Sequence, residues 1–265
     1  MKIIIQTLAV VCLMSVVGVA AEGGAKLPAQ EKFHLYLLIG QSNMAGRGKL
    51  TPADAVSPAR IQKFSKENAW VPATEPLHFD KTVAGAGLGM SFARAMADAA
   101  PDVTVGLIPC AVGGTPLDRW GKNGDLYKQA MERAKLAMKD GTLKGILWHQ
   151  GEADSGTEDK ARSYGERLAK MVASLRAELG AGEVPFVAGK LGEFLKRAGT
   201  GGKPSYWPVV NEQIGALPQH VARSAAVESA GLKDKGDGVH FDTPSLREFG
   251  KRYAAAMQQL QRKTP

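Results

Sequence analysis

The 265 residues of the chain are enough for one α/β domain with a large core, and 34 Lys and Arg against 26 Asp and Glu give a formal net charge of +8. No Lys/Arg cluster with interleaved aromatic residues occurs, which argues against a nucleic-acid-binding protein. The overall positive field leaves affinity for acidic polymers or anionic surfaces open.

Residues 1–21 predict a signal peptide. Lys2 supplies a short positive segment, an apolar run follows it, and Val19-Ala20-Ala21 offers small residues for cleavage. We expect an exported protein, periplasmic or extracellular, with no stable membrane insertion after the leader is cut. A retained membrane anchor is the alternative. Residues 22–32 then form an N-terminal linker, and one domain spans 33–262.

Strand and helix signals alternate along this domain. Short apolar runs predict five strands, at 33–39, 103–109, 144–148, 184–189 and 220–227. Helical spacing of apolar residues predicts helices at 88–100, 126–139, 159–179 and 205–217. Thr243 is expected to cap a final helix that has Pro244 at its first position. This alternation predicts a three-layer α/β/α sandwich around a five-stranded parallel sheet.

The stretch 46–87 is an insertion rich in Pro and Ala, and it is expected to form a lip over one edge of the sheet. It carries Trp70 and His78. Trp70 is a candidate platform for a sugar or a core residue, and His78 is a candidate for lining the cleft.

Polar segments follow the predicted strands, where the carboxyl ends of parallel strands meet at one edge and bind ligands. They are Gly40-Gln-Ser-Asn-Met44, the run 109–116 containing Gly113-Gly114-Thr115, the run 148–154 containing His149-Gln-Gly-Glu152, and Asp237-Gly-Val-His240.

Within these segments, Ser42 is the candidate nucleophile, with the N-cap of a following helix as its alternative role. His240 is the candidate base, and Asp237, three residues earlier, can orient its ring as in a catalytic triad. Glu152 is the stronger rival for the acid, because it lies on a different strand-end loop, and Asp242 is a weaker one.

A developing oxyanion also needs hydrogen-bond donors. Gly113 and Gly114 can present backbone N–H groups, and the amide side chain of Gln150 can point to the same place. A plain turn or an anion-binding loop is the alternative for the glycines. His149, Glu152 and Asp154 lack a recognised metal-ligand spacing, so neither a metal nor another cofactor is expected.

Taken in order, the four segments resemble the SGNH (GDSL-like) hydrolase superfamily, and within it the sialate O-acetylesterase-like branch and carbohydrate esterase family 6. The resemblance spans about residues 33 to 261. It implies a flavodoxin-like α/β/α sandwich and metal-independent ester hydrolysis. It further implies Ser42, Asp237 and His240 as the triad, and Ser42, Gly114 and Gln150 as the oxyanion donors. Some relatives use the block glutamate as the acid, which keeps Glu152 open.

The function expected from this resemblance is a secreted serine esterase that hydrolyses O-acetyl esters on carbohydrates. The substrate would be an acetylated oligo- or polysaccharide such as acetylxylan, or an O-acetylated sialic acid. Two alternatives stay open: a noncatalytic sugar- or phosphate-binding protein on the same fold, and a lipid or thioester hydrolase.

Overall fold

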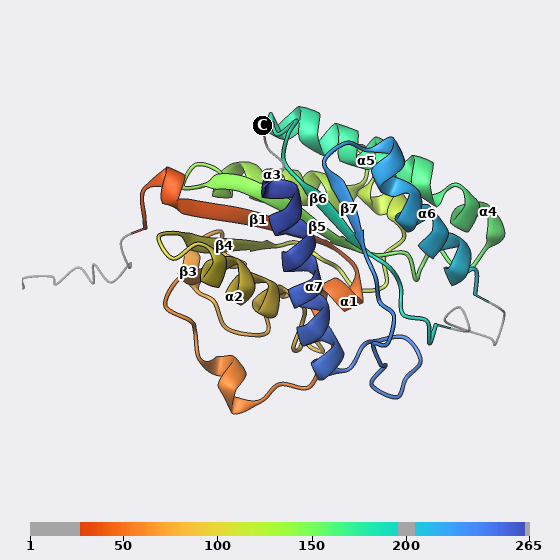
Figure 1. Cartoon of the computed structure of the whole chain (residues 1–265), viewed down its shortest axis with the longest axis horizontal. Helices are drawn as coiled ribbons and strands as arrows, with labels where there is room; N and C mark the ends of the chain where they lie inside the picture. Colours follow the sequence, from red (N-terminus) through yellow and green to blue (C-terminus); the bar gives the residue numbers. More distant parts are fainter. Residues whose placement is uncertain (1–26, 196–204, 263–265) are drawn as a thin grey trace, which may run out of the picture.

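The computed structural model describes residues 27–195 and 205–262. The signal peptide predicted at 1–21 and the first residues of the predicted linker lie outside the described residues. The strands are β1 Phe33–Gly40, β2 Ile61–Phe64, β3 Trp70–Pro72, β4 Thr104–Pro109, β5 Thr142–His149, β6 Phe186–Gly189 and β7 Ser224–Val227. They form one sheet in the order β3-β2-β4-β1-β5-β6-β7 (Figure 1). Neighbouring strands are parallel except β2 and β3, which are antiparallel.

The α/β class predicted from the sequence is confirmed, but the prediction of five strands is wrong, because the sheet has seven and is mixed. The five predicted strands are all present, and β2 and β3 come from the insertion. Ile61 and Phe64 are buried at the two ends of β2, and β2 pairs with β4 through Ile61 and Val105. Strands of three and four residues carry too little periodicity to be recognised without their partners.

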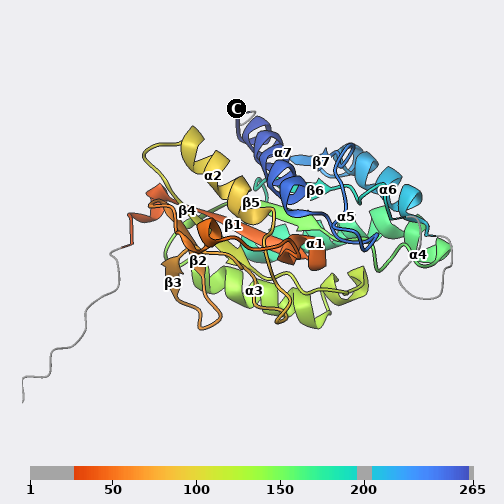
Figure 2. The ribbon, with the colours of Figure 1, turned by 90° about the horizontal axis from the view of Figure 1, so that it is seen from below.

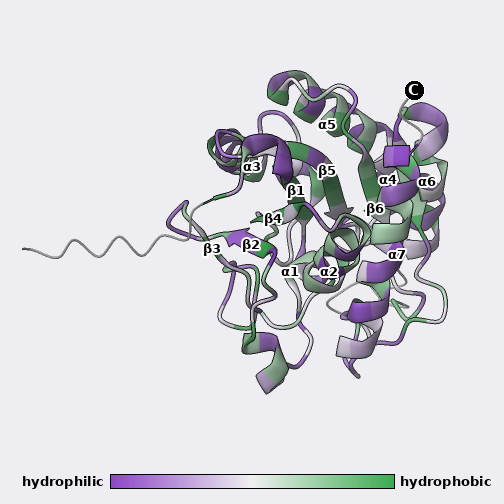
Figure 3. Cartoon of the chain, turned by 60° about the vertical axis from the view of Figure 1, so that its left-hand side comes forward, coloured by the Kyte–Doolittle hydropathy of each residue, from purple (hydrophilic) through white to green (hydrophobic). Residues whose placement is uncertain are grey.

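Helices cover both faces of the sheet and complete the three layers. The longer helices are α2 Gly89–Ala99, α3 Asp125–Ala137, α5 Tyr164–Leu179, α6 Trp207–His220 and α7 Thr243–Arg262. The short ones are α1 Ser42–Ala45, α4 Glu158–Arg162 and the 3-10 helices Gln30–Lys32, Pro52–Ala55 and Leu117–Trp120. One buried apolar cluster joins α2 and α7 to the sheet, and a second joins α3, α5 and α6 to the other face. Figure 2 shows α2 and α7 on the opposite side of the sheet from α3, and Figure 3 shows the hydrophobic central strands between them.

Three predicted boundaries are corrected by the structure. The helix predicted at 159–179 is divided into α4 and α5 at Ser163. His220 ends α6 and does not begin a strand. Asp242, not Thr243, caps α7, because its Oδ1 accepts a hydrogen bond from the N–H of Ser245 at 2.8 Å.

The end of β1 requires a glycine. Gly40 has a φ of +134°, and a Cβ atom on it would lie 2.1 Å from the carbonyl oxygen of His149 on β5. This close approach lets the chain leave β1 at the carboxyl edge and begin α1 there, with Ser42 as the first residue of that helix. Glycine at this position therefore places Ser42 at the edge where parallel sheets bind ligands.

Candidate active site

The carboxyl edge of the central strands forms a cleft of about 390 Å³. Ser42, Gly113, Gly114, Glu152 and His240 line it, although they come from four separate parts of the chain. The structure thus brings together the four polar segments that the sequence singled out. Ser42 is 5% exposed at the bottom of this cleft, so a small ester group could reach it from one side.

Ser42, His240 and Asp237 form a chain of hydrogen bonds. Nε2 of His240 lies 3.0 Å from Oγ of Ser42, and Nδ1 of His240 lies 2.7 Å from Oδ2 of Asp237. With the Nδ1–H group donating to the carboxylate, Nε2 is left to accept the hydroxyl proton of Ser42. This is the geometry that nucleophile, base and orienting acid need in a triad.

Asp237 is fixed by the backbone of its own loop. Its Oδ1 accepts hydrogen bonds from the N–H groups of Val239 at 3.0 Å and His240 at 2.8 Å. Burial acts to raise the pKa of Asp237, but the hydrogen bonds from the backbone and ring of His240 and from Val239 outweigh it and lower the pKa to about 2. The carboxylate therefore stays charged beside the imidazole.

Neither rival acid contacts the ring of His240 in the structure. Oε1 of Glu152 accepts a hydrogen bond from Nδ2 of Asn43 at 2.6 Å and lies 3.7 Å from Nε2 of His149. The side chain of Asp242 is used as the cap of α7. Burial acts to raise the pKa of Glu152, but His149 and Asn43 outweigh it and lower that pKa. Glu152 is therefore a buried, charged partner of Asn43 and His149.

Asn43 is a site residue that sequence reasoning missed. Its Nδ2 donates a hydrogen bond to the carbonyl of Val239 at 3.1 Å, and its Oδ1 accepts one from the N–H of Phe241 at 3.1 Å. These two peptide groups flank His240 on either side. Asn43 thus holds the histidine loop against α1, and Glu152 holds Asn43. The only sequence signal for this role was its position directly after Ser42.

The two glycines of the second segment differ in their hydrogen bonding. The N–H of Gly113 donates to Oδ2 of Asp80 at 2.8 Å, and the same oxygen pairs with Nη2 of Arg47 at 2.7 Å. Gly114 has a φ of +79° and lines the cleft. Across residues 27–195 and 205–262, the N–H groups of Gly114 and Ser42 have no hydrogen-bond partner. These two N–H groups are therefore free to bind a ligand oxygen.

Gln150 does not reach the cleft in the structure, contrary to the expectation of a third donor there. Its side chain is fully buried, and its Nε2 donates to the carbonyl of Thr115 at 3.0 Å and to Oδ2 of Asp154 at 2.7 Å. Both N–H groups of the amide are thus occupied, and Oε1 lies 3.0 Å from the hydroxyl of Tyr164. Gln150 ties two strand-end loops together.

Gln41 instead lines the cleft beside Ser42. Its Oε1 accepts a hydrogen bond from the N–H of Ala153 at 3.3 Å, which turns the amide nitrogen away from that loop. No described residue accepts a hydrogen bond from this nitrogen. Sequence position does not distinguish Gln41 from Gln150, because both follow a strand.

Trp70 packs against the hydrophobic core, which was the second of its two expected roles, and it does not act as a platform for a sugar. Its Nε1 donates to Oδ2 of Asp140 at 3.0 Å, and its ring packs edge-on against Phe33 with centroids 4.6 Å apart. Among the described residues, no group of three or more His, Cys, Asp or Glu side chains could hold a metal ion. In the same part of the chain, no helix has the length and apolar character needed to cross a membrane.

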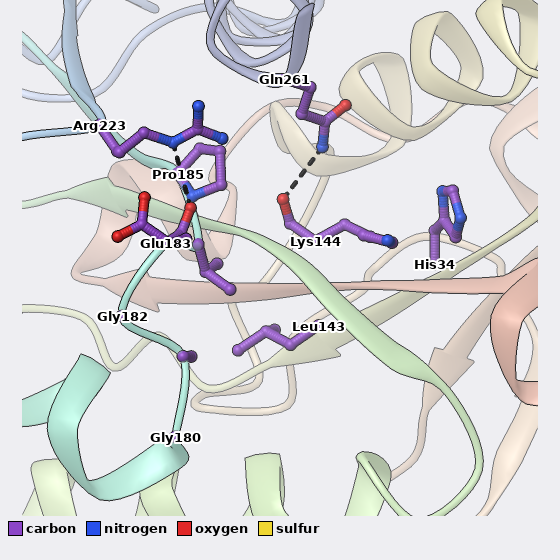
Figure 4. A pocket seen from close by; sticks show the side chains of 11 residues that line it. His34, Leu143, Lys144, Gly180, Gly182, Glu183, Pro185, Arg223 and Gln261 are labelled. Carbon is purple, nitrogen blue, oxygen red and sulfur yellow. Dashed lines mark hydrogen bonds between the residues drawn. The ribbon is translucent and has the colours of Figure 1, made fainter. Parts of the chain in front are cut away.

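A larger cavity of about 540 Å³ lies at the opposite edge of the sheet (Figure 4). His34, Lys144 and Arg223 line it at the amino ends of β1, β5 and β7. Two hydrogen bonds cross its wall, from Gln261 to the carbonyl of Lys144 at 3.0 Å and from Arg223 to the carbonyl of Glu183 at 3.2 Å. Because ligands of parallel sheets bind at the carboxyl ends of the strands, the smaller cleft at Ser42 is the candidate active site.

Several solved structures are similar to this fold. A protein of Arabidopsis thaliana superposes with a TM-score of 0.76 at 30% sequence identity, over 85% of this chain and 98% of that one. NanS superposes with a TM-score of 0.70 at 17% identity, over 90% of this chain and all of that one. A carbohydrate acetylesterase from Xanthomonas citri gives a TM-score of 0.65 at 22% identity, over 87% of this chain and 56% of that one. These likenesses confirm the α/β fold of the chain.

The family is defined by the sequence as well as by the fold. The chain belongs to the carbohydrate esterase, sialic acid-specific acetylesterase family, whose model matches residues 32–259. A curated relative described as a probable carbohydrate esterase of Arabidopsis thaliana is 31% identical, over 89% of this chain and 97% of its own length. The protein is therefore a carboxylic ester hydrolase of the carbohydrate esterase class, and the resemblance seen in the four sequence segments is confirmed.

Proposed function

We propose that the protein is a serine esterase that removes O-acetyl groups from carbohydrates. The single observation that carries this proposal is the hydrogen-bonded chain from Ser42 through His240 to Asp237, with contacts of 3.0 and 2.7 Å. The family model and the carbohydrate acetylesterase of Xanthomonas citri support a sugar acetyl ester as the substrate.

In the proposed reaction, Oγ of Ser42 attacks the acetyl carbonyl carbon while Nε2 of His240 accepts the hydroxyl proton. The N–H groups of Ser42 and Gly114 bind the oxyanion that develops, and each such donor typically contributes ~3 kcal/mol to transition-state stabilisation. His240 then donates its proton to the departing sugar oxygen, leaving an acetyl-serine. Water attacks this ester with His240 again as base, which releases acetate and restores Ser42.

Acetate release from a panel of esters tests this function. Acetylated xylan, O-acetylated sialic acid and p-nitrophenyl acetate should each be assayed with the protein from residue 22 to 265. p-Nitrophenyl octanoate serves as the long-chain comparison. We expect acetate release from at least one acetylated sugar and a preference for two-carbon over eight-carbon acyl groups. A preference for long acyl chains would indicate a lipid or thioester hydrolase, and no turnover of any ester would indicate a binding protein.

We also propose that the protein is exported and that residues 1–21 are removed as a signal peptide, after which residues 22–32 join the cleavage site to the domain. The positive and apolar order of residues 1–20 supports this. Expression of the full chain in a bacterial host should yield a periplasmic or secreted protein whose intact mass lacks the leader. A full-length product retained in the membrane fraction would contradict cleavage.

A further inference from the structure

The segment 78–83 separates the active-site cleft from two further hollows. One has a volume of about 520 Å³ and the other about 420 Å³. Lys81 lines both the cleft and the 520 Å³ hollow, and Lys66 and Phe79 line both hollows. The three spaces therefore adjoin along one segment. We call the two hollows together the cationic groove, defined by Lys63, Lys66, His78, Phe79, Lys81 and Arg133.

Arg133 in this groove is a buried cation without an anionic partner. It is 6% exposed, and its guanidinium donates to Asn68 Oδ1 at 2.6 Å and to the carbonyls of Phe64 and Ser65 at 2.9 and 3.0 Å. All three acceptors are neutral, and Arg133 makes no ion pair within the described ranges. Its Nε–H has no hydrogen-bond acceptor in the described part of the chain. The guanidinium also lies over the rings of Phe64 and Phe79, 5.2 and 4.9 Å from their centroids, which offsets part of the cost of burying the charge.

His78 places a second unpaired donor on the same 420 Å³ cavity. It is 3% exposed, and burial lowers its pKa to about 3, so the ring is neutral. Nδ1 accepts a hydrogen bond from the N–H of Ala111 at 3.2 Å, so Nε2 carries the proton. This Nε2–H finds no acceptor among the described residues. Two of the residues that line this cavity thus each carry a buried N–H group without an acceptor among the described residues.

The lysines of the cationic groove are also without carboxylate partners. Lys63 donates to the carbonyls of Thr74 and Pro76 at 2.8 and 3.0 Å, and neither Lys66 nor Lys81 forms an ion pair with a described residue.

The acidic residues of the two hollows do not neutralise these cations. Asp80 is paired with Arg47, whereas Arg247 is shared between Glu75 and Asp54, so Glu75 also attracts Lys63. Only Glu67 and Glu132 remain, and both are exposed at the rim. Positive charge is therefore in excess along the groove, and it lies in a hollow where the field is strengthened by the protein walls.

Phe79 adds a surface that suits a sugar ring. It is 40% exposed, and its ring is held by the guanidinium of Arg133, which lies 4.9 Å from the ring centroid. An aromatic ring on a hollow surface packs against the apolar face of a pyranose, and such rings supply much of the contact energy of binding sites. Phe79 thus offers the sugar platform for which Trp70 was the candidate from the sequence.

We propose that the cationic groove binds a carboxylate-bearing sugar of the acetylated substrate, with the carboxylate at Arg133 and His78 and a sugar ring on Phe79. The substrate class is then an acidic O-acetylated glycan that contains uronate units. This inference rests on the proposed esterase function and specifies its substrate. It also gives the positive net charge of the chain a role in attracting the substrate.

Direct binding tests the groove without relying on catalysis. The Ser42→Ala protein should be titrated by calorimetry with an unacetylated glucuronic-acid-bearing xylo-oligosaccharide, a neutral xylo-oligosaccharide of equal length, and N-acetylneuraminic acid. We expect the uronate oligosaccharide to bind about tenfold or more tightly than the neutral one, and binding to weaken with salt because exposed lysines contribute. Equal affinity for the acidic and neutral oligosaccharides would overturn the proposal.

Variants locate the binding to the groove. Lys66→Gln and Phe79→Ala should each weaken uronate binding by about two- to fivefold, the range for one exposed contact. Arg133→Gln should weaken it more, with its fold checked by circular dichroism because Arg133 also holds the chain at Phe64. Lys251→Gln, an exposed lysine on α7, is the matched control and should leave affinity unchanged. Unchanged binding in both Lys66→Gln and Phe79→Ala would contradict the assignment.

The choice of titrated ligands distinguishes two sources of the carboxylate, a uronate and a sialic acid. Binding of N-acetylneuraminic acid without the uronate oligosaccharide would retain the carboxylate site and overturn the assignment to uronate. The outcome is also independent of the esterase assay. Uronate binding without turnover of any ester would refute the proposed esterase function and support the uronate-binding groove. Turnover without selective uronate binding would support the esterase function and refute the groove.

Discussion

Ser42→Ala and His240→Ala are each expected to lower kcat for acetyl esters by about 10⁴-fold or more, as loss of a triad nucleophile or base does. Ser42→Ala removes the atom that forms the acyl bond. His240→Ala removes the group 3.0 Å away that accepts its proton. Substrate binding should survive, because neither side chain lies in the cationic groove.

The folded state should also survive both changes. Among the described residues, the hydroxyl of Ser42 has His240 as its one side-chain partner, and His240 is half-buried at the rim of the cleft. We therefore expect changes in the free energy of unfolding of about 1 kcal/mol or less. Stopped assays with p-nitrophenyl acetate and thermal unfolding of each variant measure the two effects.

Matched controls exist elsewhere in the chain. Ser57→Ala removes a hydroxyl that, within residues 27–195 and 205–262, makes one weak hydrogen bond of 3.4 Å to the carbonyl of Pro58. His220→Ala removes an exposed imidazole at the end of α6. Both should retain wild-type rates. A wild-type rate for Ser42→Ala or His240→Ala would show that the hydrogen-bonded chain is not the catalytic machinery.

Much of the arrangement of the candidate triad could be predicted from the sequence, because it depends on where the strands end. Ser42 comes directly after a strand whose length and apolar character are plain, and Asp237 and His240 share one short loop. A parallel sheet brings such positions together whatever the details of packing. The three residues that meet in the cleft were therefore predictable.

The residues that could not be predicted depend on contacts between distant loops. Gln150 occupies the expected strand end, but Asp154 and the carbonyl of Thr115 take both of its N–H groups. Asn43 holds the peptides around His240 across 196 and 198 residues of sequence. Burial produces a periodic spacing of apolar residues along the chain, whereas hydrogen bonds between residues this far apart produce no such pattern.

The structure of the insertion 46–87 was also not predictable, because it depends on contacts with distant parts of the chain. Its strand β2 is stabilised by pairing with β4, and the partly buried Trp70 packs against Phe33, a residue of β1. Neither interaction is local. The lip expected over the cleft therefore contributes a sheet edge through β2 and β3, and its segment 78–83 contributes the groove beside the active site.

The acid of the triad gives the second large effect. Asp237→Ala is expected to lower kcat by about 10³–10⁴-fold, because the imidazole loses the carboxylate that orients it and stabilises its charged form. The pKa of Asp237 is lowered to about 2, so its charge is present at every pH above that value and is lost only as the pH falls through it. If activity is already lost at a pH well above this pKa as the solution is acidified, the loss must come from protonation of another group.

Glu152→Ala should act differently, through Asn43. Removing the carboxylate leaves Nδ2 of Asn43 without its 2.6 Å partner, and the loop around His240 loses part of its support. We expect a smaller loss of kcat, about 10- to 100-fold, together with a decrease of about 1–3 kcal/mol in the free energy of unfolding, because a buried donor becomes unsatisfied. Asn43→Ala should reproduce both effects, since it removes the same links.

Glu152→Gln separates position from charge. The amide oxygen can still accept from Asn43, so this variant should recover much of the activity and stability that Glu152→Ala loses. Asp237→Asn should recover little, because the ring of His240 needs a charged partner at Nδ1. Kinetics with p-nitrophenyl acetate and urea unfolding of all five variants give the comparison. A greater loss of kcat in folded Glu152→Ala than in Asp237→Ala would mean that the loop moves during catalysis and that Glu152, not Asp237, orients the histidine.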